Sequence, residues 1–231
     1  MNKLTIFDLD NTLLKGDSDR NWGEFLSEKR IVSDDYLLRS EEFYNNYYEG
    51  SLDIDGFLNF CLEPLKNNDM DLLLELREEF IEKKIKPIML SRALAKVKEE
   101  MEDSIVIIAT ATNDFVTKPI AKLFGIDNLI ATEFEIMNNK FTGQVLGLPC
   151  FREGKLKKVT EWINLKGYTL AESKFYSDSF NDLPLLEKVK KAVVVDGDEK
   201  MIYREDMEFF IKQSPNNEAR IEIEKKSQGS N

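Results

Sequence analysis

Two carboxylates, Asp8 and Asp10, stand directly after a short apolar segment near the start of the chain. The segment includes Leu4, Ile6 and Phe7, which suit a short buried strand of a parallel sheet. Side chains alternate along an extended segment, so both carboxylates leave on the same side and need a cation or a shared proton. An isolated pair of this kind is more often a solvated strand end. Whether the pair binds a ligand or is only a solvated strand end therefore depends on the other polar residues of the sequence.

Other polar residues follow apolar segments further along the chain. Thr110 ends the most apolar run of the sequence, and Asp178 ends a later one, with Asp182 four residues beyond it. Lys155 lies at the start of a helical pattern. Each of these residues also has a purely structural interpretation. Thr110 could cap the next helix, Asp178 and Asp182 could be turn residues, and Lys155 could be a solvated charge on a helix. In open α/β sheets, however, ligand sites form at the carboxyl ends of the strands, and all four residues are expected there.

The absence of histidine limits the chemistry. None of the 231 residues is a histidine, which excludes Ser-His-Asp and Cys-His catalysis, phosphohistidine chemistry and histidine-ligated zinc. The two cysteines, Cys61 and Cys150, are far apart, which argues against a disulfide scaffold or a thiolate zinc site and fits a reducing cytosol. Acid–base work therefore falls to Asp, Glu, Lys or Tyr.

The charge and hydropathy of the chain restrict its partners. The net charge of −11 disfavours nonspecific binding to nucleic acid or to anionic membranes. No apolar run approaches the ~20 residues of a membrane span, and the first apolar stretch is broken at Asp8, unlike a secretory signal. We therefore expect a cytoplasmic protein that acts on a small molecule. The sequence does not fix its oligomeric state.

Residues 17–85 show no strand signal and predict four short amphipathic helices that form one inserted bundle. Its apolar residues at helical spacing are Trp22, Phe25 and Leu26, then Phe43, Tyr44, Tyr47 and Tyr48, then Phe57, Leu58, Cys61, Leu62 and Leu65, and finally Leu72, Leu73, Leu76 and Phe80. We interpret the aromatic stripe from Phe43 to Tyr48 as bundle core rather than as a ligand site.

The rest of the chain alternates strands with helices, which predicts an α/β fold with a doubly wound parallel sheet and right-handed crossovers. The expected elements are a helix opened by Pro87, a strand at 104–110, a turn at 111–113, a helix at 119–124, a strand at 129–132, a hairpin around 138–140, a helix at 154–165, a strand at 174–178, a short helix at 183–189 and a strand at 192–196. The predicted division is an α/β core of residues 1–16 and 86–213, a helical cap of residues 17–85, and a polar tail of residues 214–231 that frays.

The polar residues match four motifs in order. Phe-Asp-Leu-Asp-Asn-Thr-Leu-Leu at 7–14, Thr110, Glu-Gly-Lys at 153–155 and Tyr-Ser-Asp-Ser-Phe-Asn-Asp at 176–182 resemble the motifs of the haloacid-dehalogenase superfamily. The likeness covers about residues 1–196 and is to the phosphoserine-phosphatase-like subfamily IB, which has a helical cap. Gly-Asp-Ser-Asp at 16–19 and Thr-Ala-Thr-Asn at 110–113 resemble an uncharacterised branch of it.

The resemblance implies a Mg²⁺-dependent phosphomonoesterase with an aspartyl-phosphate intermediate. Asp8 would be the nucleophile, and Asp10 would protonate the leaving group and then activate water. Thr110 and Lys155 would hold the phosphate oxygens. Mg²⁺ would be held by Asp8, Asp178 and the backbone carbonyl of Asp10, with Asp182 as a further or outer ligand.

The resemblance also implies that the cap sets the substrate. Asp17 stands where phosphoserine phosphatases meet the substrate amine, and Asn181 and Ala111 are the other expected substrate-binding residues. The cap arginine that binds the substrate carboxylate has no obvious match. Arg20 and Arg39 are candidates to replace it, but we interpret them as solvated surface residues. The predicted substrate is a small phosphorylated metabolite of the histidinol phosphate or phosphoserine type, and an amine without a carboxylate fits best.

Three alternatives differ from a phosphatase. A receiver-type phosphoacceptor domain also uses Asp, Thr, Lys and Mg²⁺. It places the acidic pair and the phosphoacceptor on different strands, however, and it has no large helical insertion. A noncatalytic phospho-ligand-binding relative is disfavoured because every catalytic position is intact. A phosphomutase or phosphotransferase on the same scaffold uses the same residues and remains open.

Overall fold

The computed structural model describes residues 3–197, 207–212 and 220–225. Its main sheet has the order β4-β3-β2-β1-β5-β6. The strands are β1 (Lys3–Phe7), β2 (Ser104–Asn113), β3 (Asn128–Met137), β4 (Lys140–Leu146), β5 (Ser173–Ser177) and β6 (Lys191–Val194). All neighbours are parallel except β3 and β4. This arrangement confirms the predicted doubly wound α/β fold.

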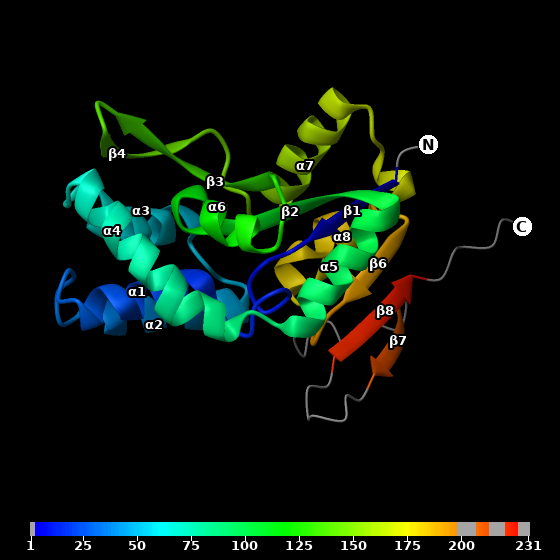
Figure 1. The fold of residues 1–231 in the computed structure, drawn as a ribbon, viewed down its shortest axis with the longest axis horizontal. Coiled ribbons are helices and arrows are strands. Elements are labelled where there is room, and N and C mark those ends of the chain that lie inside the picture. The colour runs from blue at the N-terminus through cyan, green and yellow to red at the C-terminus, as the bar shows by residue number, and fades with distance from the viewer. Residues whose placement is uncertain (1–2, 198–206, 213–219, 226–231) are drawn as a thin grey trace, which may run out of the picture.

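Helices cover both faces of the sheet (Figure 1). The helices of this part are α5 (Ser91–Asp103), α6 (Asp114–Leu123), α7 (Glu153–Lys166) and α8 (Leu183–Leu186). Ile108 of β2 packs in one core with Val97 of α5, whereas its neighbour Ile107 packs in a second core with Val159 of α7. Because both faces are buried, the strands are apolar without alternation, which is the pattern that predicted them.

The four predicted helices between β1 and β2 are present at one end of the sheet (Figure 1). They are α1 (Ser18–Glu28), α2 (Tyr36–Glu49), α3 (Ile54–Lys66) and α4 (Met70–Phe80), followed by a π-helical turn (Ile81–Ile85). Gly50 ends α2 in a left-handed conformation (φ 79°), which glycine adopts without strain. Trp22 of α1 packs edge-on against Phe115 of α6, which joins the helical insertion to the core.

Several predicted boundaries are wrong. Pro87 lies in a short 3₁₀ turn (Lys86–Ile88), and α5 begins only at Ser91, because the chain is first extended at Met89, which pairs with Leu14. The expected turn at 111–113 is instead the end of β2, where Asn113 pairs with Thr132 of β3. Asn113 then caps α6 by accepting a hydrogen bond from the amide of Val116 at 3.1 Å, so this helix also starts earlier than predicted.

The hairpin and the tail complete the described chain. Asn138 (φ 50°) and Asn139 (φ 60°) join β3 to β4, and two positive φ angles are what a tight hairpin turn requires. Strands β7 (Met207–Lys212) and β8 (Arg220–Lys225) pair antiparallel, so part of the segment expected to fray is a strand. Residues 214–219 and 226–231 of that segment lie outside the described residues. No helix in the described ranges is long and apolar enough to cross a membrane.

Candidate active site

A narrow cavity of about 50 Å³ lies between the carboxyl ends of β1, β2 and β5 and the inserted helices. All the site residues predicted from the sequence line it: Asp8, Asp10, Asp17, Thr110, Ala111, Lys155, Asp178, Asn181 and Asp182. Parallel neighbours end at one edge, so residues that are more than 160 positions apart meet there.

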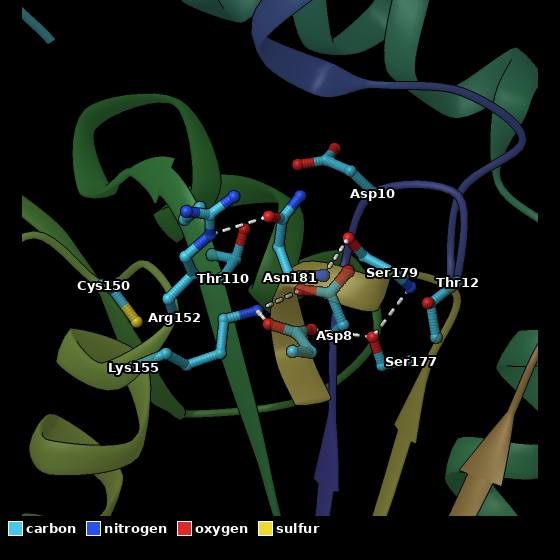
Figure 2. A network of polar contacts seen from close by, with 12 residues as sticks. Asp8, Asp10, Thr12, Thr110, Cys150, Arg152, Lys155, Ser177, Ser179 and Asn181 are labelled. Atoms are coloured by element: carbon cyan, nitrogen blue, oxygen red, sulfur yellow. Dashed lines mark hydrogen bonds and ion pairs between the residues drawn. The ribbon is translucent and has the colours of Figure 1, made fainter. Parts of the chain in front are cut away.

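Lys155 is buried between two carboxylates. Its Nζ lies 2.9 Å from Asp8 Oδ1 (Figure 2). It also lies 2.6 Å from Asp182 Oδ1. The other oxygen of Asp182 accepts a hydrogen bond from Ser177 Oγ at 2.7 Å. Burial opposes the charge of Lys155, but Asp182 and Asp8 raise the pKa of its ammonium group well above the usual value. The lysine is therefore a fixed cation, and Asp182 is occupied in holding it.

The start of α7 brings Lys155 to this place. Gly154 precedes it, and a Cβ at this position would lie 2.1 Å from the carbonyl oxygen of Pro149. Only glycine allows the first turn of α7 to approach that backbone so closely. This contact gives a structural reason for the glycine of the Glu-Gly-Lys motif.

Asp8 and Asp178 are destabilised as anions. Burial raises the pKa of Asp8 to about 7; Lys155 opposes this effect, while Asp182 and Asp10 add to it. Burial also raises the pKa of Asp178 well above its usual value, and the charges of Asp8 and Asp182 raise it further. Thr12 Oγ1 donates to Asp178 Oδ1 at 3.1 Å and fixes the carboxylate.

The candidate metal ligands at Asp8 and Asp178 are carboxylate oxygen atoms, which suit a hard cation such as Mg²⁺. The chain has no histidine to favour a softer metal. Within the described residues, no group of three or more acidic, histidine or cysteine side chains is arranged to hold an ion by itself. A metal ion would therefore need backbone oxygens and water in addition to the side chains of Asp8 and Asp178.

Asp10 points away from Asp8, toward the inserted helices (Figure 2). Its two carboxylate oxygens accept hydrogen bonds from the amide of Ser18 at 2.6 Å and from Thr112 Oγ1 at 2.8 Å. Burial, followed by the charge of Asp17, raises the pKa of Asp10 to about 7. A carboxyl group of this kind can exchange a proton near neutral pH, and it is separate from the Asp8–Lys155 pair.

The wall of the cavity formed by the inserted helices is acidic and aromatic. Asp17 Oδ1 accepts hydrogen bonds from the Arg20 amide at 2.8 Å and from Tyr44 OH at 3.0 Å. Asp19 is buried and accepts from Asn113 Nδ2 at 3.2 Å and from the Cys61 thiol at 3.4 Å. Burial is the main cause that raises the pKa of Asp17 to about 6 and that of Asp19 to about 7.

The aromatic stripe packs in the bundle, as interpreted, and also forms part of the cavity wall. The aromatic residues on this wall are Phe43, Tyr44, Tyr47, Tyr48 and Phe57. The same helix face meets both the bundle and the cavity, and helical spacing cannot separate these two environments. Neither Arg20 nor Arg39 lines the cavity; their guanidinium groups pair with Glu41 and Glu63 and are half-exposed.

Several residues at or next to the cavity were given no role at the site from the sequence, among them Thr112, Asp19, Tyr47 and Arg152. Thr112 belongs to the segment at 110–113 and Asp19 to the segment at 16–19. Since both segments resemble motifs of the family, the sequence could have indicated that these two residues lie at the site. Tyr47 donates to or accepts from Ser179 Oγ at 2.8 Å, and Arg152 bonds Asn181, contacts that no local pattern indicates.

The comparison with known protein families shows the family to which this chain belongs. Residues 5–187 match the model of the haloacid dehalogenase-like hydrolases. The chain belongs to this family. The predicted family and the prediction of an enzyme, a hydrolase, are therefore confirmed.

Individual relatives of this hydrolase agree with the family assignment. A protein of Neisseria meningitidis named histidinol-phosphatase is 38% identical over 87% of this chain and 93% of its own. A crystal structure of a Bordetella pertussis protein of unknown function has a TM-score of 0.82 at 36% identity, over 87% of this chain and 93% of that one. A substrate-bound phosphoserine phosphatase has a TM-score of 0.66 at 19% identity, over 87% and 90% of the two chains, and shares the fold.

Proposed function

We propose that this hydrolase is a Mg²⁺-dependent phosphomonoesterase that forms an aspartyl-phosphate on Asp8. The observation that carries the proposal is the pairing of buried Asp8 with Lys155, 2.9 Å away, while Asp10 is held apart by Ser18 and Thr112. One carboxylate is thus placed as a nucleophile beside a fixed cation. The other is placed to move protons.

The residues of the chain divide the reaction between them. Asp8 attacks phosphorus and the bond to the leaving oxygen breaks; Asp10 gives that oxygen a proton. Asp10 then takes a proton from the water that attacks the phosphoryl group and releases phosphate and free Asp8. Lys155, Thr110, Asn181 and the backbone at Ala111 bind the phosphate oxygens. Asp182 positions Lys155 through their ion pair, and its role as a further or outer ligand of Mg²⁺ stays a prediction.

Asp8, Asp178 and the backbone carbonyl of Asp10 would hold Mg²⁺. The ion would neutralise the phosphate oxygens and offset the repulsion that raises the pKa values of Asp8 and Asp178.

The acidic wall supports a positively charged leaving group. Asp10, Asp17 and Asp19 lie on it, and within the described part of the chain no lysine or arginine side chain forms an ion pair with any of them. Aromatic faces beside them favour a cation further. An ammonium-bearing phosphomonoester without a carboxylate fits this wall, and histidinol phosphate, named for the Neisseria relative, is the substrate that we propose.

We further propose that residues 17–85 act as a cap that sets specificity, on a core of residues 1–16 and 86–213. Phosphate release is measured with Mg²⁺ on histidinol phosphate, phosphoserine and p-nitrophenyl phosphate. We expect the highest kcat/KM with histidinol phosphate. Asp17→Asn should lower kcat/KM at least tenfold on histidinol phosphate and change p-nitrophenyl phosphate hydrolysis less than twofold, since the aryl ester has no ammonium group.

Arg39→Ala, a change at a surface ion pair, is the matched control and should affect neither substrate. An equal loss on both substrates in Asp17→Asn would assign Asp17 to structure or chemistry instead of recognition. Release of no phosphate from any monoester would reject the phosphatase assignment.

A further inference from the structure

Arg152 adopts a backbone conformation that residues with a side chain rarely adopt. Its φ and ψ are 48° and −120°, at the residue that precedes α7 and three positions before Lys155. Such conformations persist where the surrounding contacts hold them, and they are enriched at functional sites. The contacts made by the Arg152 side chain indicate what is held here.

The guanidinium group of Arg152 joins two segments that are far apart in the sequence. Nε donates to Asn181 Oδ1 at 2.9 Å (Figure 2), and Nη2 donates to the carbonyl oxygen of Gly50 at 2.8 Å. Asn181 belongs to the acidic motif after β5. Gly50 is the C-cap residue of helix α2. A planar fork of donors can satisfy two acceptors at fixed directions, which a lysine cannot do.

The bond to Arg152 fixes which way the Asn181 amide faces. Its oxygen is taken by Nε, so its nitrogen, with two N–H donors, is the end left for another acceptor. Asn181 lines the cavity together with Asp8 and Lys155. A phosphate oxygen fits as this acceptor, because the proposed reaction brings a phosphoryl group between Asp8, the nucleophile, and Lys155, the cation that binds it.

A second contact ties the same two segments together. Tyr47 of α2 hydrogen-bonds Ser179 Oγ at 2.8 Å, and Ser179 Oγ accepts from the backbone N–H of Asn181 at 3.2 Å. The cavity of about 50 Å³ beneath these contacts has room for only a few water molecules. The end of α2 forms part of the wall of this cavity, so moving that end outward to admit a phosphomonoester would break the bond from Arg152 to Gly50.

We propose that Arg152 is a positioning residue that aims the Asn181 amide at the phosphoryl group as the end of α2 closes over it. The proposal rests on the proposed phosphatase function. It links enclosure of the substrate to completion of the phosphate site, because one guanidinium makes both bonds.

The test uses Arg152→Gly, Arg152→Lys, Asn181→Ala and the double variant Arg152→Gly/Asn181→Ala in the full chain. Glycine accepts the backbone conformation of Arg152, so Arg152→Gly should keep the thermal midpoint of the wild type. We expect kcat/KM to fall at least tenfold in Arg152→Gly and in Arg152→Lys. The double variant should be no worse than Asn181→Ala, and guanidinium ion at millimolar concentration should partly restore Arg152→Gly but not Asn181→Ala.

Additive losses in the double variant, full activity of Arg152→Lys, or no rescue by guanidinium would overturn the proposal. Calorimetric binding of inorganic phosphate with Mg²⁺ gives a readout without turnover. Arg152→Gly should weaken this binding as much as Asn181→Ala does, and unchanged binding would also overturn it. If the wild type binds phosphate but hydrolyses no ester, the proposed function fails while the role of Arg152 is still tested.

Discussion

The ammonium group of Lys155 lies 2.9 Å from the carboxylate of Asp8 at a site where both side chains are almost fully buried. Lys155 also pairs with Asp182 at 2.6 Å, so its single positive charge is shared between two carboxylates, and Asp178 adds a third negative charge nearby. When all three carboxylates are ionised, the site carries an excess of negative charge. Protons or a cation must offset it.

We predict that activity requires Mg²⁺ and that EDTA abolishes it. Since the ion binds the folded protein only, Mg²⁺ should also raise the thermal midpoint of the EDTA-treated protein. Ca²⁺ should inhibit in competition with Mg²⁺, because its larger and looser coordination lets Asp8 bind through both oxygens and lose its direction of attack. Scanning calorimetry and phosphate release measure both effects. Full turnover in metal-free buffer would contradict the metal assignment.

Asp19 predicts a pH-dependent stability. Burial raises its pKa from 3.8 to about 7, so the folded state binds its proton more tightly than the unfolded state does. The stability that this proton contributes is complete below the unfolded pKa and is lost as pH rises through about 7. A rise of that size corresponds to at most roughly 4 kcal/mol.

Asp19→Asn isolates the contribution of this one group. The amide stays neutral, so the thermal midpoint of the variant minus that of the wild type should increase between pH 5 and pH 8 in EDTA. Asp55, exposed in the first turn of α3, supplies the control. Asp55→Asn should give a flat difference over the same range. A flat difference for Asp19→Asn as well would mean that Asp19 is ionised in the folded protein.

Gly154 and Gly56 give a matched pair of alanine substitutions. At Gly154 the new Cβ would lie 2.1 Å from a backbone oxygen of Pro149, whereas at Gly56 it would meet the end of the Asp53 side chain, which can rotate away. Gly154→Ala should cost about 1–3 kcal/mol of stability and lower kcat by moving Lys155. Gly56→Ala, inside α3, should be neutral or stabilise by about 0.4–1 kcal/mol. Urea unfolding checks both, and equal effects would refute the backbone clash.

The sequence predicted the site better than it predicted the boundaries and the cross-contacts. Asp8, Thr110 and Asp178 could be assigned because each stands at the end of an apolar run of the sequence, and the carboxyl ends of neighbouring parallel strands meet at one edge. The end of β2 could not be predicted, because Asn113 remains extended only through its pairing with Thr132. The role of Arg152 depends on Gly50, which lies 102 positions earlier. No local pattern carries that information.

The two aspartates of the first motif should separate the two steps of the reaction. Asp8→Asn should be inactive on every substrate, since an amide is a poor nucleophile and brings no negative charge to the metal. Asp10→Asn keeps the backbone carbonyl and can still accept one hydrogen bond through its amide oxygen, but it cannot exchange a proton. p-Nitrophenolate leaves with little protonation, so the first step should partly survive in this variant.

The second step in Asp10→Asn should stall, because the attacking water still needs a base. We expect a burst near one equivalent of p-nitrophenolate, followed by turnover at least 100-fold slower than the wild type. Acid quench and mass spectrometry should then locate one phosphate on Asp8. Thr112→Val removes a hydrogen bond to Asp10 but leaves its carboxyl group, so this control should turn over repeatedly without a burst. Sustained turnover by Asp10→Asn, or phosphate on a serine, threonine or lysine, would contradict the roles assigned here, because the phosphate on Asp8 should accumulate only when residue 10 can no longer act as the base.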